Sequence, residues 1–172
     1  MPRRLVLVLV VVVAVAWLGF RAVRAFDQDR HAAEAAAVLA APDKVSYDLP
    51  PVPVFPSRPD IGPKGQFTYR PGTWLSVVDL QGTEPEAGDG RYLVFLRNWA
   101  GWTLAGAARP RPDGTAQVRS GAEPRPPTVY EVVVTWGVDD ATSVPHGQPV
   151  LHWFDGSLGP PRAVPFNFAR GA

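Results

Sequence analysis

The chain begins with its longest apolar run. Every side chain from Leu5 to Phe20 is uncharged, and the run follows directly after Arg3 and Arg4. As an α-helix these residues would span about 24 Å, slightly less than the ~30 Å hydrocarbon core of a bilayer, and the flanking arginines can snorkel to the interface. The pattern therefore predicts a single transmembrane helix, a signal anchor in residues 1–25. The expected span includes Leu5, Val12, Trp17 and Phe20.

The same run also has features of a signal peptide. The sequence "VRA" ending at Ala25 offers small residues at the positions that a signal peptidase reads, so secretion after cleavage near Ala25 is the alternative. Arg21 and Arg24 lie between the apolar run and that site, where signal peptides are usually neutral, and this favours retention. We expect a single-pass membrane protein with its N-terminus inside and its C-terminal domain extracytoplasmic.

Two segments of different composition follow the apolar run. Residues 26–41 are rich in alanine and predict a membrane-proximal helix that continues the apolar one without a break. Residues 42–64 contain seven prolines, which remove hydrogen-bond donors and favour extended chain, so they predict a stiff Pro-rich linker. The alternative is a docking segment, because Val52, Val54 and Phe55 are apolar enough to be buried.

From residue 65 onward the apolar positions recur with a period of two, which is typical of strands. Such runs cover 73–80, 91–99, 130–136, 149–154 and 163–168. The dipeptide Asp113-Gly114 predicts a tight turn between strands near 102–109 and 115–119. We therefore expect a mainly β fold, in which residues 65–172 form one extracytoplasmic domain. Its architecture is expected to be an antiparallel β-sandwich or a partly open barrel of about 7–8 strands.

Composition and charge exclude several classes of function. The formal net charge is +1, so no basic field predicts nucleic acid as a partner. The chain has no cysteine, which rules out disulfides, thiolate metal sites and cysteine nucleophiles. The sequence also lacks the G-x-S-x-G, P-loop and G-x-G-x-x-G patterns of familiar hydrolases and nucleotide-binding proteins. We expect a protein that is not an enzyme and has no cofactor.

Three histidines are the remaining candidates for metal or acid–base chemistry. His31 falls in the alanine-rich helix and is expected to be solvated. His146 and His152 could form a His–His–Asp site with Asp155 or with residues 139–140. Their spacing matches neither a helical i,i+4 pair nor a strand i,i+2 pair, so we expect no catalytic and no metal-binding residues.

Five of the six tryptophans lie in the predicted β domain, where most are expected in the core. Trp99 and Trp102 bracket Ala-Gly at a strand junction, so these two are the candidates for an exposed binding surface.

The layout suggests a membrane-anchored, non-enzymatic binding or assembly subunit of a cell-envelope complex. The expected partners are the lipid bilayer, through the N-terminal helix, and another envelope protein, with a glycan as a further possibility. One alternative is a glycan- or peptidoglycan-binding module, which requires Trp99 or Trp102 to be exposed beside polar groups. The other is a pilin-like structural subunit, whose layout fits but whose short leader ending in glycine and acidic residue within the apolar run are missing.

Overall fold

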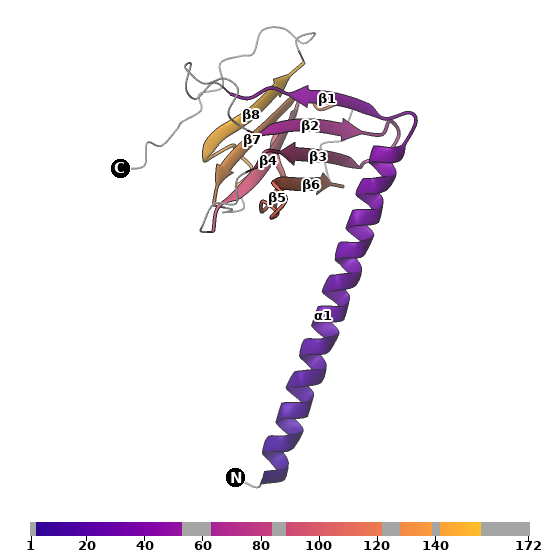
Figure 1. Ribbon diagram of the computed structural model, residues 1–172, viewed down its shortest axis with the longest axis vertical. Coiled ribbons are helices and arrows are strands. Elements are labelled where there is room, and N and C mark those ends of the chain that lie inside the picture. Colours follow the sequence, from indigo (N-terminus) through magenta and orange to yellow (C-terminus); the bar gives the residue numbers. More distant parts are fainter. Residues whose placement is uncertain (1–2, 53–62, 84–88, 122–127, 139–141, 156–172) are drawn as a thin grey trace, which may run out of the picture. The chain divides into compact units, whose positions relative to one another are not determined.

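A computed structural model describes residues 3–52, 63–83, 89–121, 128–138 and 142–155, and in the helix it describes no side chains at 3–11 and 24–28. The described residues form one helix and eight strands (Figure 1). The chain divides into two compact units, Met1–Ala36 and Ala37–Ala172. We call the second of these the β unit.

Helix α1 covers Arg3–Ala40 and confirms that the apolar run and the alanine-rich segment form one continuous helix. No proline interrupts this stretch, and alanine, leucine and arginine are strong helix formers. Pairs of side chains one turn apart add support. The Arg30 Nε atom lies 3.1 Å from Glu34 Oε1, and the Arg21 guanidinium lies 4.6 Å from the centre of the Trp17 ring.

The expected transmembrane span is not supported. In the described part of the chain, no helix combines the length and the apolar character that crossing a bilayer demands. Val12, Trp17 and Phe20 are exposed on α1, and the side chain of Leu5 lies outside the described residues.

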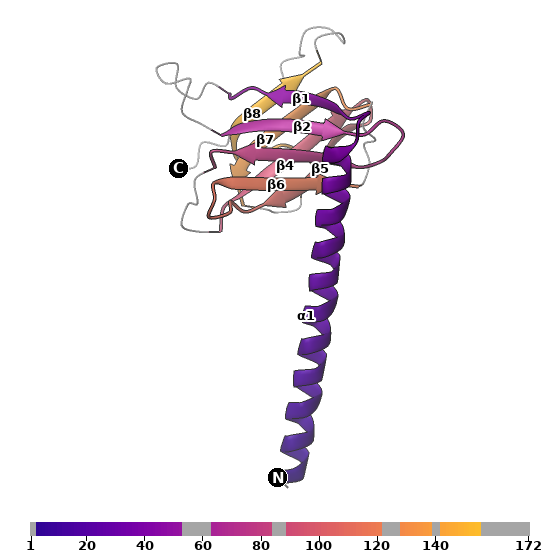
Figure 2. The same ribbon diagram turned by 45° about the vertical axis from the view of Figure 1, so that its right-hand side comes forward.

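The eight strands form two antiparallel four-stranded sheets, which confirms the predicted mainly β, sandwich-like fold. Sheet A contains, in spatial order, β1 (Val45–Leu49), β2 (Lys64–Tyr69), β3 (Ser76–Gln81) and β6 (Thr115–Ser120). Sheet B contains β5 (Gly101–Ala108), β4 (Arg91–Asn98), β7 (Glu131–Gly137) and β8 (Gln148–Phe154). The two sheets stack face to face with their strands crossing obliquely (Figures 1 and 2). The predicted run at 163–168 lies outside the described residues.

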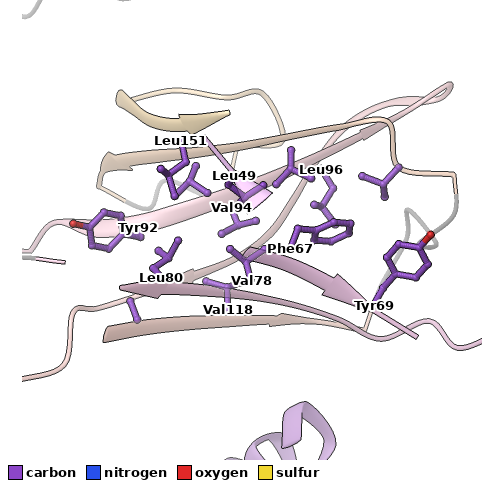
Figure 3. Packing of buried hydrophobic residues seen from close by; sticks show 14 residues of the cluster. Leu49, Phe67, Tyr69, Val78, Leu80, Tyr92, Val94, Leu96, Val118 and Leu151 are labelled. Atoms are coloured by element: carbon purple, nitrogen blue, oxygen red, sulfur yellow. The ribbon is translucent and has the colours of Figure 1, made fainter. Parts of the chain in front are cut away.

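Alternating side chains of both sheets fill the space between them (Figure 3). In β4, Tyr92, Val94 and Leu96 point into this core, as the period-two pattern predicts. The intervening Leu93 and Phe95 are also fully buried, on the other face of sheet B. The apolar side chains of β4 are therefore buried on both faces, and on the outer face the His146 ring packs against Phe95.

Strand β1 and the residues up to Val52 lie within the predicted Pro-rich linker, and this described part of the segment belongs to the fold. Leu49 is only 2% exposed and belongs to the core cluster. Beyond it, the Val52 amide donates to the Val150 carbonyl at 2.8 Å, and the His152 amide donates to the Pro50 carbonyl at 3.0 Å. Proline lacks a donor but keeps its carbonyl, so a Pro-rich chain can pair along a sheet edge. Val54 and Phe55 lie outside the described residues.

The role of β1 can be tested by removing its core side chain. We expect Leu49→Ala to lower the free energy of unfolding by about 2–5 kcal/mol, because it leaves a cavity among buried side chains. The neighbouring Asp48 is exposed, and Asp48→Ala should change stability by no more than about 0.5 kcal/mol. Urea unfolding of the full chain, followed by tryptophan fluorescence, measures both. An equal, small effect of the two substitutions would show that β1 contributes little to the core.

Candidate functional site

The connection between β4 and β5 presents a large aromatic side chain to solvent. Asn98 pairs with Gly101, so the turn consists of Trp99 and Ala100 alone. The Asn98 side-chain oxygen accepts a hydrogen bond from the Ala100 amide at 2.9 Å, which fixes the turn locally. Trp99 is 77% exposed, the highest exposure of any large apolar side chain described in the β unit.

Four aromatic side chains and one arginine gather at this end of sheet B. We call Trp99, Trp102, Tyr130 and Phe154 the aromatic cluster. The Trp99 ring lies 5.1 Å from the Tyr130 ring, which lies 6.4 Å from the Phe154 ring. The guanidinium of Arg97 lies 5.3 Å from the ring of Trp102 and 5.7 Å from that of Tyr130, within the range of cation–π contacts.

Strand register brings these residues together from distant parts of the sequence. Arg97 on β4 pairs with Trp102 on one side and with Glu131 of β7 on the other. Glu131 in turn pairs with Phe154 at the end of β8. The Tyr130 amide donates to the Arg97 carbonyl at 3.1 Å, which fixes the residue preceding β7 beside the arginine. The cluster is thus held in place by three strand pairings, β5–β4, β4–β7 and β7–β8, and not by a long loop.

A buried carboxylate anchors Arg97. The Glu131 side chain is only 2% exposed, and each of its oxygens has a partner. Arg97 Nη1 donates to Oε2 at 3.0 Å, and the Nε2 atom of His152 is hydrogen-bonded to Oε1 at 2.9 Å. A carboxylate removed from water needs such partners, because its desolvation otherwise costs several kcal/mol. The pairing holds the guanidinium between the carboxylate and two aromatic rings.

The structure places the two tryptophans of the expected binding surface at one site. Trp99 is exposed, and Trp102 is half-buried beside Arg97. Sequence reasoning missed Arg97, Tyr130 and Glu131 as members. One signal was available in the sequence, because Glu131 is a charged residue directly before the apolar run of β7. If that strand is buried, the Glu131 side chain is buried with it and needs a partner.

The two later histidines have different surroundings. His146 forms hydrogen bonds with Thr142 Oγ1 at 2.8 Å and with the Val144 carbonyl at 3.0 Å, and its ring packs edge-on against Phe95 at 5.4 Å. His152 faces Glu131 instead. Among the residues that the structure describes, no three His, Cys, Asp or Glu side chains are grouped to hold a metal ion. Residues 139–140 lie outside that part of the chain.

No family model matches this sequence, and no curated protein or solved structure matches it either. The site combines flat aromatic faces, one of them open to solvent, with a cation held among them. Trp, Tyr and Arg are the residue types that contribute most to binding energy at protein interfaces.

The anchoring of Arg97 can be tested by its removal. We expect Arg97→Met to lower the free energy of unfolding by about 3 kcal/mol, because the Glu131 carboxylate stays buried without its cation. Arg109→Met is the control, because the Arg109 side chain and its ion-pair partner Asp89 are both exposed, and it should cost no more than about 1 kcal/mol. Chemical unfolding of the full chain compares the two. Equal losses would mean that Arg97 acts as an ordinary surface arginine.

Proposed function

We propose that the protein is a non-enzymatic binding or assembly subunit that engages a protein partner through the aromatic cluster and Arg97. The observation that carries this proposal is the exposure of Trp99 on a two-residue turn, with its ring packed on Tyr130. A tryptophan side chain can bury about 150–250 Å² at an interface, as much as any side chain offers.

Preorganisation supports a role in binding rather than in packing alone. The turn is held by a side-chain hydrogen bond, and Tyr130 limits the orientations of the exposed ring. A side chain that is already ordered loses less conformational entropy when it meets a partner. The charge beside it is also fixed, because Arg97 is held by Glu131. Such a surface favours a partner with a complementary apolar pocket and a carboxylate or carbonyl acceptor at its rim.

Protein binding is favoured over glycan binding at this surface. Stacking of a sugar needs an open aromatic face surrounded by polar groups that are free to bond its hydroxyls. Trp99 offers such a face, but two polar groups near the aromatic cluster, Arg97 and His152, direct a nitrogen inward to the buried Glu131 carboxylate. A protein partner with an apolar pocket and an acceptor at its rim matches the two groups that the cluster offers, the Trp99 ring and the Arg97 guanidinium.

Placement at a cell envelope is a part of the proposal that rests on the sequence alone, on the apolar run from Leu5 to Phe20. Alkaline carbonate washing of membranes from the producing cells, followed by mass spectrometry of the N-terminal peptide, tests it. We expect the full-length chain to stay in the membrane fraction. Recovery of the intact chain in the soluble fraction would contradict envelope placement, and a chain starting at Phe26 would show secretion instead.

The binding role of Trp99 is tested with a photo-crosslinking amino acid placed at position 100, the exposed neighbour of Trp99 on the two-residue turn, in the producing cell. We expect a discrete adduct with another protein, and loss of that adduct when Trp99 is also replaced by alanine. Val144 is an exposed apolar residue on a different loop, and position 144 serves as the control. The same adducts from both positions, or none from position 100, would contradict the proposal.

A second measurement separates binding from stability. Trp99→Ala should leave the free energy of unfolding within about 0.5 kcal/mol, because most of the side chain is already in water. Its affinity for the crosslinked partner should fall at least about tenfold, the loss typical of an interface hot spot. A large loss of stability would instead assign Trp99 a structural role.

A further inference from the structure

The outer face of sheet A carries a groove that differs in chemistry from the aromatic cluster. Its volume is about 480 Å³, within the size range of small-molecule sites. Its floor consists of strands β1, β2, β3 and β6, and the β5–β6 turn forms one wall. Most of the side chains around it are polar, including Asp48, Gln66, Asp79, Gln117, Lys64 and Arg111.

Four of these side chains form a straight row across the sheet, one from each strand. Asp48 pairs with Gln66, Gln66 with Asp79, and Asp79 with Gln117. We call this set the polar row. Within it, each glutamine amide donates to an aspartate: Gln66 Nε2 to Asp48 Oδ1 at 3.2 Å, and Gln117 Nε2 to Asp79 Oδ1 at 2.6 Å. These contacts orient the side chains before any ligand arrives.

The oriented pairs keep both donors and acceptors. A carboxamide carries two N–H donors and an oxygen acceptor, and a carboxylate has two oxygens, so the hydrogen bond within each pair uses only part of this capacity. The adjacent row on the same face adds the ammonium group of Lys64, the amide of Gln81 and the hydroxyl of Thr115. The groove therefore presents alternating donors and acceptors over its floor.

The turn that forms the wall is held rigidly. The Arg111 amide donates to the Thr115 carbonyl at 2.7 Å, and the Gly114 amide donates to the Arg111 carbonyl at 3.0 Å. Asp113 Oδ1 accepts hydrogen bonds from the hydroxyl and the amide of Thr115, at 2.7 and 3.0 Å. These bonds lower the pKa of the Asp113 carboxyl below its ordinary value of 3.8, so Asp113 is ionised at neutral pH.

Charge and shape restrict what the groove can hold. Three aspartates, at 48, 79 and 113, face two cations, Lys64 and Arg111, so the lining carries one more negative than positive formal charge. This balance disfavours phosphate and polyanions, and the polar lining disfavours apolar ligands. A peptide strand would need a free sheet edge, whereas this surface is a sheet face. The remaining match is a neutral ligand with many hydroxyl groups.

The spacing of side chains along the polar row also matches the length of the repeating unit in such a ligand. Neighbouring strands lie about 4.8 Å apart, so the four side chains cover about 14 Å. One strand spacing is close to the length of one pyranose unit in an extended oligosaccharide. We propose that the outer face of sheet A is a binding site for a neutral oligosaccharide, which lies across the strands with its hydroxyls bonded to the polar row. This site is separate from the aromatic cluster and does not depend on the protein partner proposed above.

The test is an NMR titration of the full-length, ¹⁵N-labelled chain with glucose, cellotetraose and chitotetraose. We expect the side-chain amide signals of Gln66 and Gln117 to shift with at least one tetrasaccharide, more strongly than with glucose, while the Trp99 indole signal stays unchanged. Gln117→Ala should weaken binding about tenfold, the effect of one to two lost hydrogen bonds. Gln148→Ala is the matched control, an exposed glutamine on sheet B, and should bind like the parent.

Each opposite result would overturn the proposal. Unchanged Gln66 and Gln117 signals with all three saccharides would show that the polar row is a solvated sheet face. A response to calcium chloride or to inorganic phosphate with no response to saccharide would show an ion site. A shift of the Trp99 indole would move saccharide binding to the aromatic cluster. Trp99→Ala, which should weaken partner binding at least about tenfold, is expected to leave saccharide binding intact, so the two proposals can fail separately.

Discussion

The central strands of sheet B are buried on both faces, and the rest of the β unit depends on this double burial. On one face, β4 and β7 contribute to the core between the sheets. On the other face, Leu93 pairs with Thr135 and Phe95 with Val133, and all four are at most 1% exposed. A strand so enclosed has no water to solvate a charge. The next residue of β7 on this face is Glu131, and its carboxylate therefore requires protein partners.

The aromatic cluster follows from that requirement. Glu131 is held by Arg97 and His152, and each of these stands on a strand next to β7. Arg97 then lies beside Trp102 and Tyr130, whose rings shield the ion pair from solvent on the side where burial ends. Trp99 continues the same aromatic surface into water. The proposed partner site is thus the exposed end of this network of side chains. The buried end of the network, at Glu131, belongs to the interior of the fold.

Sheet A meets a different constraint. Its inner face packs on the core, and its outer face carries polar side chains from every strand, as antiparallel sheets commonly do. The Pro-rich chain after β1 leaves this sheet and bonds to β8 of sheet B through the Pro50 carbonyl and the Val52 amide. Because proline has no donor, this segment adds only a few hydrogen bonds to β8 while covering part of a sheet edge. One short stretch therefore connects the two layers of the sandwich.

Some of this was already determined by the sequence. The period-two runs locate β3, β4, β7 and β8, and Asp113-Gly114 locates the β5–β6 turn. The proline-free N-terminal stretch locates one long helix. These features can be predicted because local sterics and the alternation of side chains decide them. Strand β1 was missed because the number of prolines suggested a linker. The alternation of Val45, Tyr47 and Leu49 indicates a strand only when a core is present to bury these side chains.

The sites were decided by the tertiary structure. The sequence marked Trp99 and Trp102 as candidates, but Arg97 and Glu131 are 34 residues apart, and Asp79 and Gln117 are 38 residues apart. Nothing in local spacing sets which strand lies beside which. Strand order and register, fixed by the packing of two whole sheets, put these polar partners side by side. The amino-acid pattern determined the elements and their inward faces, and the assembly of the sheets determined which outward side chains meet.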